Sequence, residues 1–439
     1  MDRVAYIGLL LLGAANLVPW MTMLSLSDYF ESLYHSNAME FWFPAFSTSA
    51  LIASSATLLV VGSKLSFNAR IAFPTLMMAL LMLVVPAVDM LVRWEMISLD
   101  TAFAVTLGSV MLNSVFSATT QNSLYALGSL LSDEATQAVQ TGSGIIGLVS
   151  VGLRLASKVG LASTPAMWAF CLAGCAILLA SLFAYTALLS DPKVRVKVDA
   201  HERRRALAQR KDLTQPMLAN PLSEDSSHHP SAWSMLRLTC VQVRHLPRSP
   251  AFSHLLSPSL TFSHLLSPSL TFSMLRLTCV QSMSVYSVFL VCLATFPGLT
   301  TSLVSNTFHL GDWYPLLMVA AYNTFDLVGK GLPASLRLLD DKSLPIAAAC
   351  HALFVPLFLL LAHPHMLPPI LRSDFVAVGA VSLLGLCTGY IGCMALMLGG
   401  EKGRTPEEKE VCGMVTSFSL MLGLASGSNV GALVLSSLV

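Results

Sequence analysis

The 439-residue sequence contains few charged residues, 11% of the total, whereas a soluble domain has about 25%. The 25 Lys and Arg residues balance 24 Asp and Glu residues, for a net charge of +1, so the basic excess that attracts nucleic acid is absent. The nine cysteines include no Cys-x-x-Cys pair. Cys171 and Cys175 lie one helical turn apart in an apolar run, which is typical of buried, inert thiols. We therefore expect no disulfide framework, no metal, no cofactor and no nucleic-acid partner.

Enzyme motifs are also missing, because the chain has no hydrolase elbow, P-loop or zinc-binding helix signature. Residues 142–147 match G-x-G-x-x-G, but they lie inside an apolar run and no predicted strand precedes them. Glycines in such a run favour close helix packing instead. The same interpretation applies to Gly385 and Gly389, and to the glycines of residues 423–431. We do not expect an enzyme.

Long apolar runs dominate the chain, which is 54% hydrophobic and has a mean hydropathy of +0.69. A membrane-spanning helix needs about 20 apolar residues. Eleven runs satisfy this length, and they predict an all-α membrane protein: Val4–Leu24, Phe41–Val61, Ile71–Leu91, Ala102–Leu130, Ala138–Val159, Pro165–Leu189, Val285–Val304, Trp313–Leu332, Leu344–Ala362, Phe375–Leu398 and Val411–Leu438.

The distribution of Lys and Arg predicts the orientation, because basic loops stay on the cytoplasmic side. With the N-terminus inside, 21 of the 25 basic residues are cytoplasmic. Only Arg93, Arg154, Lys158 and Arg372 fall outside. An odd number of spans then places the C-terminus outside.

Three regions follow from the spacing of the runs: a six-helix bundle over 1–190, a polar segment over 191–281 and a five-helix bundle over 282–439. The polar segment is rich in Ser, Pro and basic residues, which predicts a largely disordered cytoplasmic loop. It contains exact repeats, since 252–261 recurs as 262–271 and 234–242 recurs as 273–281. We interpret these copies as a recent duplication or a gene-model artefact.

Polar residues within the spans indicate where a binding site lies, because polar groups at membrane depth usually face the bundle interior. Asn113, Ser117, Gln121 and Tyr125 recur every four residues and form one stripe on a helix. This stripe favours a cavity lining for a neutral, polar-edged ligand. The alternative is hydrogen bonding between helices.

The sharpest pattern lies in the eighth run, where Asn323, Asp326 and Lys330 share one helix face. Two interpretations remain: an internal ion pair that neutralises two costly charges, or a binding site or gate. Trp20, which follows Pro19, is either an interfacial residue or a stacking wall for a planar ligand.

Several separated segments resemble the equilibrative nucleoside transporters. The resemblance rests on Leu17-Val18-Pro19-Trp20, Gln121-Asn122-Ser123-Leu124-Tyr125, Thr141-Gly142-Ser143-Gly144 with Gly147, Phe296-Pro297, Tyr322-Asn323-Thr324-Phe325-Asp326 with Gly329-Lys330, and Gly413 through Leu424. It implies eleven spans in two bundles of six and five, a cytoplasmic N-terminus and an arrangement similar to the major facilitator fold.

The resemblance also implies a substrate site. Leu17, Trp20 and Leu24 would border the nucleobase, and Gln121 would contact the base edge. Asn323 lies beside Asp326, which would face the ribose, with Lys330 where the family usually has arginine. Leu424 would add an apolar wall from the last helix.

We therefore predict a facilitative carrier of nucleosides, extending to nucleobases, that works as a monomer in the lipid bilayer by alternating access. We expect the plasma membrane, with an internal membrane as the alternative. The rival interpretations are a carrier of another small polar solute and a receptor-like membrane protein that does not transport.

Overall fold

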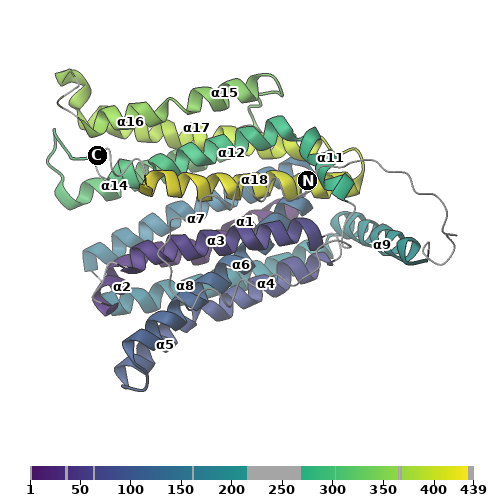
Figure 1. The fold of residues 1–439 in the computed structure, drawn as a ribbon, viewed down its shortest axis with the longest axis horizontal. Coiled ribbons are helices and arrows are strands. Elements are labelled where there is room, and N and C mark those ends of the chain that lie inside the picture. Colours follow the sequence, from purple (N-terminus) through teal and green to yellow (C-terminus); the bar gives the residue numbers. More distant parts are fainter. Residues whose placement is uncertain are drawn as a thin grey trace, which may run out of the picture. The chain divides into compact units, whose positions relative to one another are not determined.

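The structure is a computed structural model, and it describes residues 2–34, 38–62, 65–160, 163–214, 268–301, 303–363, 365 and 368–433. Within these residues the chain forms α-helices with three short 3-10 helices and no strand. The long helices run alongside one another (Figure 1). The all-α architecture predicted from the apolar runs is confirmed.

The helices of the first six predicted spans form the first half of the membrane region. They are α1 (Arg3–Ser25), α2 (Ser27–Tyr34), α3 (Ala38–Val61), α4 (Phe67–Met82), α5 (Val84–Arg93), α6 (Leu99–Leu131), α7 (Asp133–Gly160) and α8 (Ser163–Ser190). The third predicted span is divided at Leu83, because Pro86 has no N–H to donate to the Met82 carbonyl and its ring crowds that group.

The last five predicted spans form the second half. Their helices are α12 (Cys279–Thr295), α13 (Gly298–Thr301), η5 (Gly311–Trp313), α14 (Tyr314–Gly331), η6 (Leu332–Ala334), α15 (Ser343–His351), α16 (Phe354–Ala362), η8 (Pro369–Arg372), α17 (Asp374–Glu401) and α18 (Pro406–Leu433). Pro297 separates α12 from α13, and Pro356 accompanies the break between α15 and α16.

Nine of the described helical segments are long and apolar enough to cross a membrane. The other two predicted spans correspond to α3, whose described apolar part is Phe46–Val61, and to α14. α14 is less apolar because it carries Asn323, Asp326 and Lys330. The protein is an integral, multi-pass membrane protein.

Helices occupy both described ends of the segment 191–281, for which the composition predicts disorder. α9 spans Pro192–Thr214 and α11 spans Pro268–Leu277. Val194, Val198 and His201 form one buried face of α9, and burial of that face against the membrane helices accounts for the order. The first copies of the two repeats lie outside the described residues, whereas the second copy of the nine-residue repeat forms the end of α11 and the start of α12.

Bare glycine backbone permits the closest helix contacts. A methyl group on Gly142 of α7 would overlap the carbonyl oxygen of Leu10 in α1, and one on Gly389 of α17 would overlap that of Asp326 in α14. The glycine pattern of α7 therefore serves helix packing, as predicted, and does not form a dinucleotide loop.

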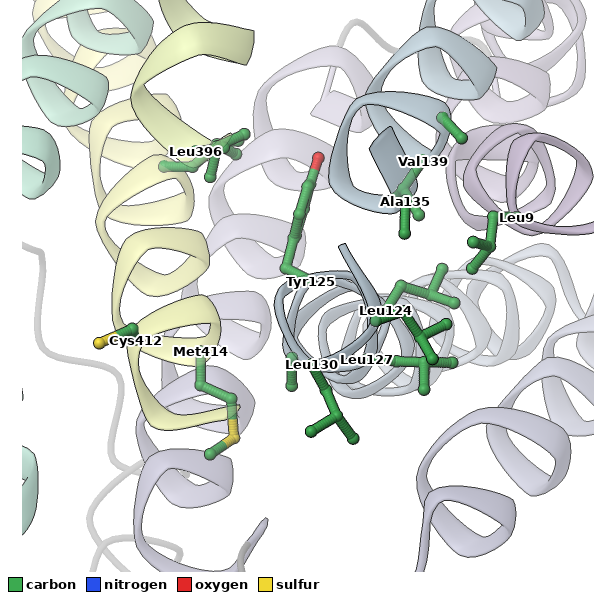
Figure 2. Close-up of a cluster of buried hydrophobic side chains, with 14 of the residues drawn as sticks. Leu9, Leu124, Tyr125, Leu127, Leu130, Ala135, Val139, Leu396, Cys412 and Met414 are labelled. Atoms are coloured by element: carbon green, nitrogen blue, oxygen red, sulfur yellow. The ribbon is translucent and has the colours of Figure 1, made fainter. Parts of the chain in front are cut away.

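An apolar cluster joins the two halves of the membrane region near the start of α7. Figure 2 shows Tyr125 of α6 between Ala135 and Val139 of α7 on one side and Leu396 of α17 on the other. All four side chains are buried, and the Tyr125 hydroxyl donates to Gln140 Oε1 at 2.5 Å. The contact surface between the two halves is called the seam below. The cluster excludes water from this part of the seam.

Substitution of Gly142 tests the close approach of α1 and α7. We expect Gly142→Ala to lower stability by about 1 to 3 kcal/mol, because the added methyl group forces the helices apart. Gly152→Ala on the same helix is the matched control, since nothing lies within 4 Å of its added carbon. Thermal unfolding of the detergent-solubilised protein measures both. Equal melting temperatures for the two variants would contradict the packing argument.

Candidate functional site

The charged pair of α14 is buried inside the second half. Asp326 is 5% exposed and Lys330 is 7% exposed, and Lys330 Nζ lies 2.7 Å from Asp326 Oδ2. Their i, i+4 spacing places both side chains on one face, which α17 covers through Gly385 and Gly389. The ion pair of the first interpretation is therefore present. Burial of two charges is costly even when they pair, so their retention at membrane depth favours a function.

Asn323 occupies the same face of α14 and lies against α7. Its Nδ2 donates to the Val319 carbonyl oxygen at 2.9 Å. Its Oδ1 lies 2.5 Å from the position that a methyl group on Gly147 would take. The glycine thus makes room for the amide at the boundary between the two halves.

The C-terminal end of α14 is hydrogen-bonded to α7. The Lys330 carbonyl oxygen accepts from Gln137 Nε2 at 3.1 Å and from Thr141 Oγ1 at 3.2 Å. Neither Gln137 nor Thr141 was among the site residues predicted from the sequence. These bonds join the first half to the helix that carries the charged pair.

Gln121 lies in the first half, at the contact between α6 and α1. Its Oε1 accepts from Asn16 Nδ2 at 3.1 Å, and Ser117 Oγ donates to the Asn16 carbonyl oxygen at 3.1 Å. Hydrogen bonds between helices therefore engage Ser117, Gln121 and Tyr125 of the predicted stripe. Both amide atoms of Asn113 are buried and have no hydrogen-bond partner in the described part of the chain.

The predicted apolar walls lie in two different clusters. Leu17 and Trp20 are half-buried and pack against the core of the first half, where the ring centroids of Trp20 and Phe43 are 5.4 Å apart. Leu24 is 36% exposed. Leu424 of α18 is half-buried against the cluster that joins the halves. Among the described residues, no hydrogen bond or ion pair links Gln121 or Trp20 directly to the α14 residues.

A buried charge network connects the two halves on the side of the molecule that holds the start of α1. Arg70 of α4 donates from Nη2 to Glu410 Oε1 of α18 at 2.6 Å. His201 Nε2 of α9 lies 2.6 Å from Glu410 Oε2. All three residues are at most 2% exposed. No local sequence pattern indicates this network, because Arg70 and His201 lie 340 and 209 residues before Glu410 in the chain.

The helical arrangement resembles the major facilitator fold. The proton:xylose symporter XylE of the major facilitator superfamily superposes with a TM-score of 0.55, at 13% identity, over 96% of this chain and 85% of the symporter.

The chain belongs to the nucleoside transporter family, whose model matches residues 107–435. It is 27% identical to equilibrative nucleotide transporter 1 of Arabidopsis thaliana, over 97% of this chain and 84% of that protein. Equilibrative nucleoside transporter 4 of Homo sapiens is 25% identical over 97% of the chain and 81% of its own length. Equilibrative nucleoside transporter 1 of Rattus norvegicus is 24% identical, with coverages of 83% and 75%. The chain is a transporter and not an enzyme.

The buried ion pair of α14 makes a prediction about stability. We expect Lys330→Met alone to destabilise the protein by about 3 to 5 kcal/mol, because Asp326 stays buried without its partner. Asp326→Asn combined with Lys330→Met removes both charges, and we expect it to recover most of the lost stability. Melting temperatures of the two variants and the wild type measure this. A double variant no more stable than the single one would contradict a mutually neutralising pair.

Proposed function

We propose that the protein carries nucleosides across the membrane passively by alternating access. The observation that carries the proposal is the buried Asp326–Lys330 pair, on a helix that is hydrogen-bonded to the other half, in a chain of the nucleoside transporter family. Nucleosides combine a planar base with a hydroxyl-rich ribose, so their carrier needs both apolar walls and polar partners. The first half offers an amide and an aromatic ring, and the second half offers a carboxylate.

Each proposed contact follows from the chemistry of its side chain. The Asp326 carboxylate accepts hydrogen bonds from ribose hydroxyls, with Lys330 and Asn323 beside it. The Gln121 amide pairs with a donor and an acceptor on the base edge. Leu17, Trp20, Leu24 and Leu424 supply apolar surface for the faces of the base. Lys330 keeps the positive charge of the family's arginine. Its ammonium is a point charge, however, and lacks the planar guanidinium that can donate two parallel hydrogen bonds.

Alternating access requires the two halves to separate first on one side and then on the other. In this structure the buried contacts close the side that the charge distribution predicts to be cytoplasmic. Three connections close it: the Arg70–Glu410–His201 network, the apolar cluster around Tyr125, and the bonds to the Lys330 carbonyl oxygen. We propose that all three break when the carrier opens to the cytoplasm.

The last connection involves the proposed site directly. The backbone of Lys330 is bonded to α7 while its side chain is paired with Asp326. A ribose that competes for the Asp326 carboxylate changes the environment of the same residue that holds the halves together. This supports coupling of substrate binding to the opening of the cytoplasmic side. Because one chain contains both halves, we propose that it works as a monomer.

Uptake of radiolabelled adenosine and uridine in transporter-deficient cells tests the proposed function. We expect saturable uptake by the wild type, and a loss of at least about tenfold in Asp326→Asn, because an amide is a weaker acceptor than a carboxylate and leaves the lysine charge unpaired. Asp100→Asn, at an exposed position in the first turn of α6, is the matched control.

Surface delivery of all three proteins is measured in parallel. Normal delivery without nucleoside uptake by the wild type would overturn the proposal and favour a carrier of another polar solute or a receptor-like protein. Equal uptake by Asp326→Asn and Asp100→Asn would remove Asp326 from the site.

Maleimide labelling of a cysteine placed at position 414 tests whether the cytoplasmic side is closed. Met414 is 1% exposed, and its sulfur lies 3.8 Å from Arg70 Nη1 across the seam between the halves. In a Met414→Cys background, we expect Glu410→Gln to raise the rate of maleimide labelling at that position about tenfold, as a 1.4 kcal/mol weakening of the closed state predicts. Inside-out vesicles expose the relevant side, and mass spectrometry of the peptide quantifies the label.

The control for this experiment is Lys402→Gln, which breaks a pair with Asp341 inside the second half only. It leaves the seam intact, so the labelling rate stays at its background value. A labelling rate unchanged by Glu410→Gln would show that the buried network does not hold the halves closed.

A further inference from the structure

Asn16 of α1 is a buried amide that the family resemblance does not include among the substrate-site residues. It is 4% exposed, and it lies one helical turn before Trp20, on the same face of α1. Its Nδ2 donates to Gln121 Oε1 at 3.1 Å, and its carbonyl oxygen accepts from Ser117 Oγ. Two side-chain amides thus form one pair between α1 and α6.

This pair leaves two polar atoms without partners. Asn16 Oδ1 is buried and accepts no hydrogen bond in the described part of the chain. Gln121 Nε2 is not fully buried, and it makes no hydrogen bond to the described residues although it carries two protons. A buried polar group that lacks a partner is costly. Such groups persist where a ligand or water satisfies them.

The two atoms without a partner are an acceptor, Asn16 Oδ1, and a donor, Gln121 Nε2, one on each amide of the pair. The amino edge of adenine presents the complementary set, because its N6 amino group donates and the adjacent N1 accepts. Rotation of both amides by a half-turn exchanges their roles and again leaves one donor and one acceptor. The chemistry of the pair is therefore independent of which amide donates.

We propose that Asn16 is a second base-contacting residue, which accepts from the exocyclic amino group while Gln121 donates to the neighbouring ring nitrogen. This inference rests on the proposed nucleoside transport and assigns to it a specificity-determining residue. Both amides then select for bases that carry an amino group.

Adenosine and purine riboside separate these contacts, because purine riboside has the same ring and ribose but no amino group. We expect Asn16→Leu to raise the KM for adenosine uptake about tenfold, which corresponds to one lost hydrogen bond of about 1.4 kcal/mol. The KM for purine riboside changes less than about twofold. The wild type therefore discriminates between the two nucleosides, and the variant does not.

Asn122→Leu is the matched control, since Asn122 is the neighbouring buried amide on α6 and contacts Met421 of α18. We expect it to leave the ratio of the two KM values unchanged, even if the maximal rate falls. Asn16→Ala, which adds no volume, replaces Asn16→Leu if the larger side chain prevents surface delivery.

The experiment distinguishes failure of the proposed Asn16 contact from failure of the proposed nucleoside transport. Saturable uptake of both nucleosides by the wild type, with an equal change of both KM values in the Asn16 variants, would overturn the role of Asn16 and leave nucleoside transport intact. Absence of nucleoside uptake by a well-delivered wild type would instead overturn the proposed function on which the inference rests.

Discussion

A polar group that leaves water for the interior of a membrane protein loses free energy unless it finds a partner, and this cost organises much of the structure. Asp326 forms an ion pair with Lys330 on its own helix, and Glu410 pairs with Arg70 and His201 on two other helices. Gln121 accepts a hydrogen bond from Asn16. Partners within one helix leave the two halves free to move. Partners on different halves hold them together until something replaces the contact.

The placement of these pairs explains how one side of the carrier stays closed. The network around Glu410 and the bonds to the Lys330 carbonyl oxygen cross from one half to the other. The apolar cluster around Tyr125 lies in the same seam and keeps it dry. Hydrogen bonds and ion pairs strengthen when water is excluded, so the cluster and the polar contacts support each other. In the proposed mechanism, a substrate that competes for polar groups near this seam acts on the same contacts that keep it shut.

Glycine gives this arrangement its close contacts. In α7 one glycine contacts α1, whereas Gly144 and Gly147 contact Leu327 and Asn323 of α14. A single helix therefore packs against both halves with its bare backbone. Small residues let rigid helices shift against each other without the interlocking of large side chains, which suits a boundary that must rearrange.

Much of the fold could be predicted from local sequence. Apolar runs of about 20 residues locate the helices, because an apolar helix long enough to cross the bilayer satisfies its own backbone. The i, i+4 spacing of Asp326 and Lys330 likewise predicts their contact, since helix geometry alone brings them together. Within 191–281, composition does not show the buried face of α9 formed by Val194, Val198 and His201, because that face depends on other helices that cover it.

The sequence by itself determined the helices, the family and the residues that share a helix face, because each of these depends on residues that are near in the chain or on a recognisable motif. Only the tertiary structure decided which polar groups meet across helices. Asn16 and Gln121 are 105 residues apart, and Arg70 and Glu410 are 340 apart, so no periodicity relates them. Their contacts exist because the packing of the two halves brings buried polar groups together, and each group's need for a partner makes those contacts specific.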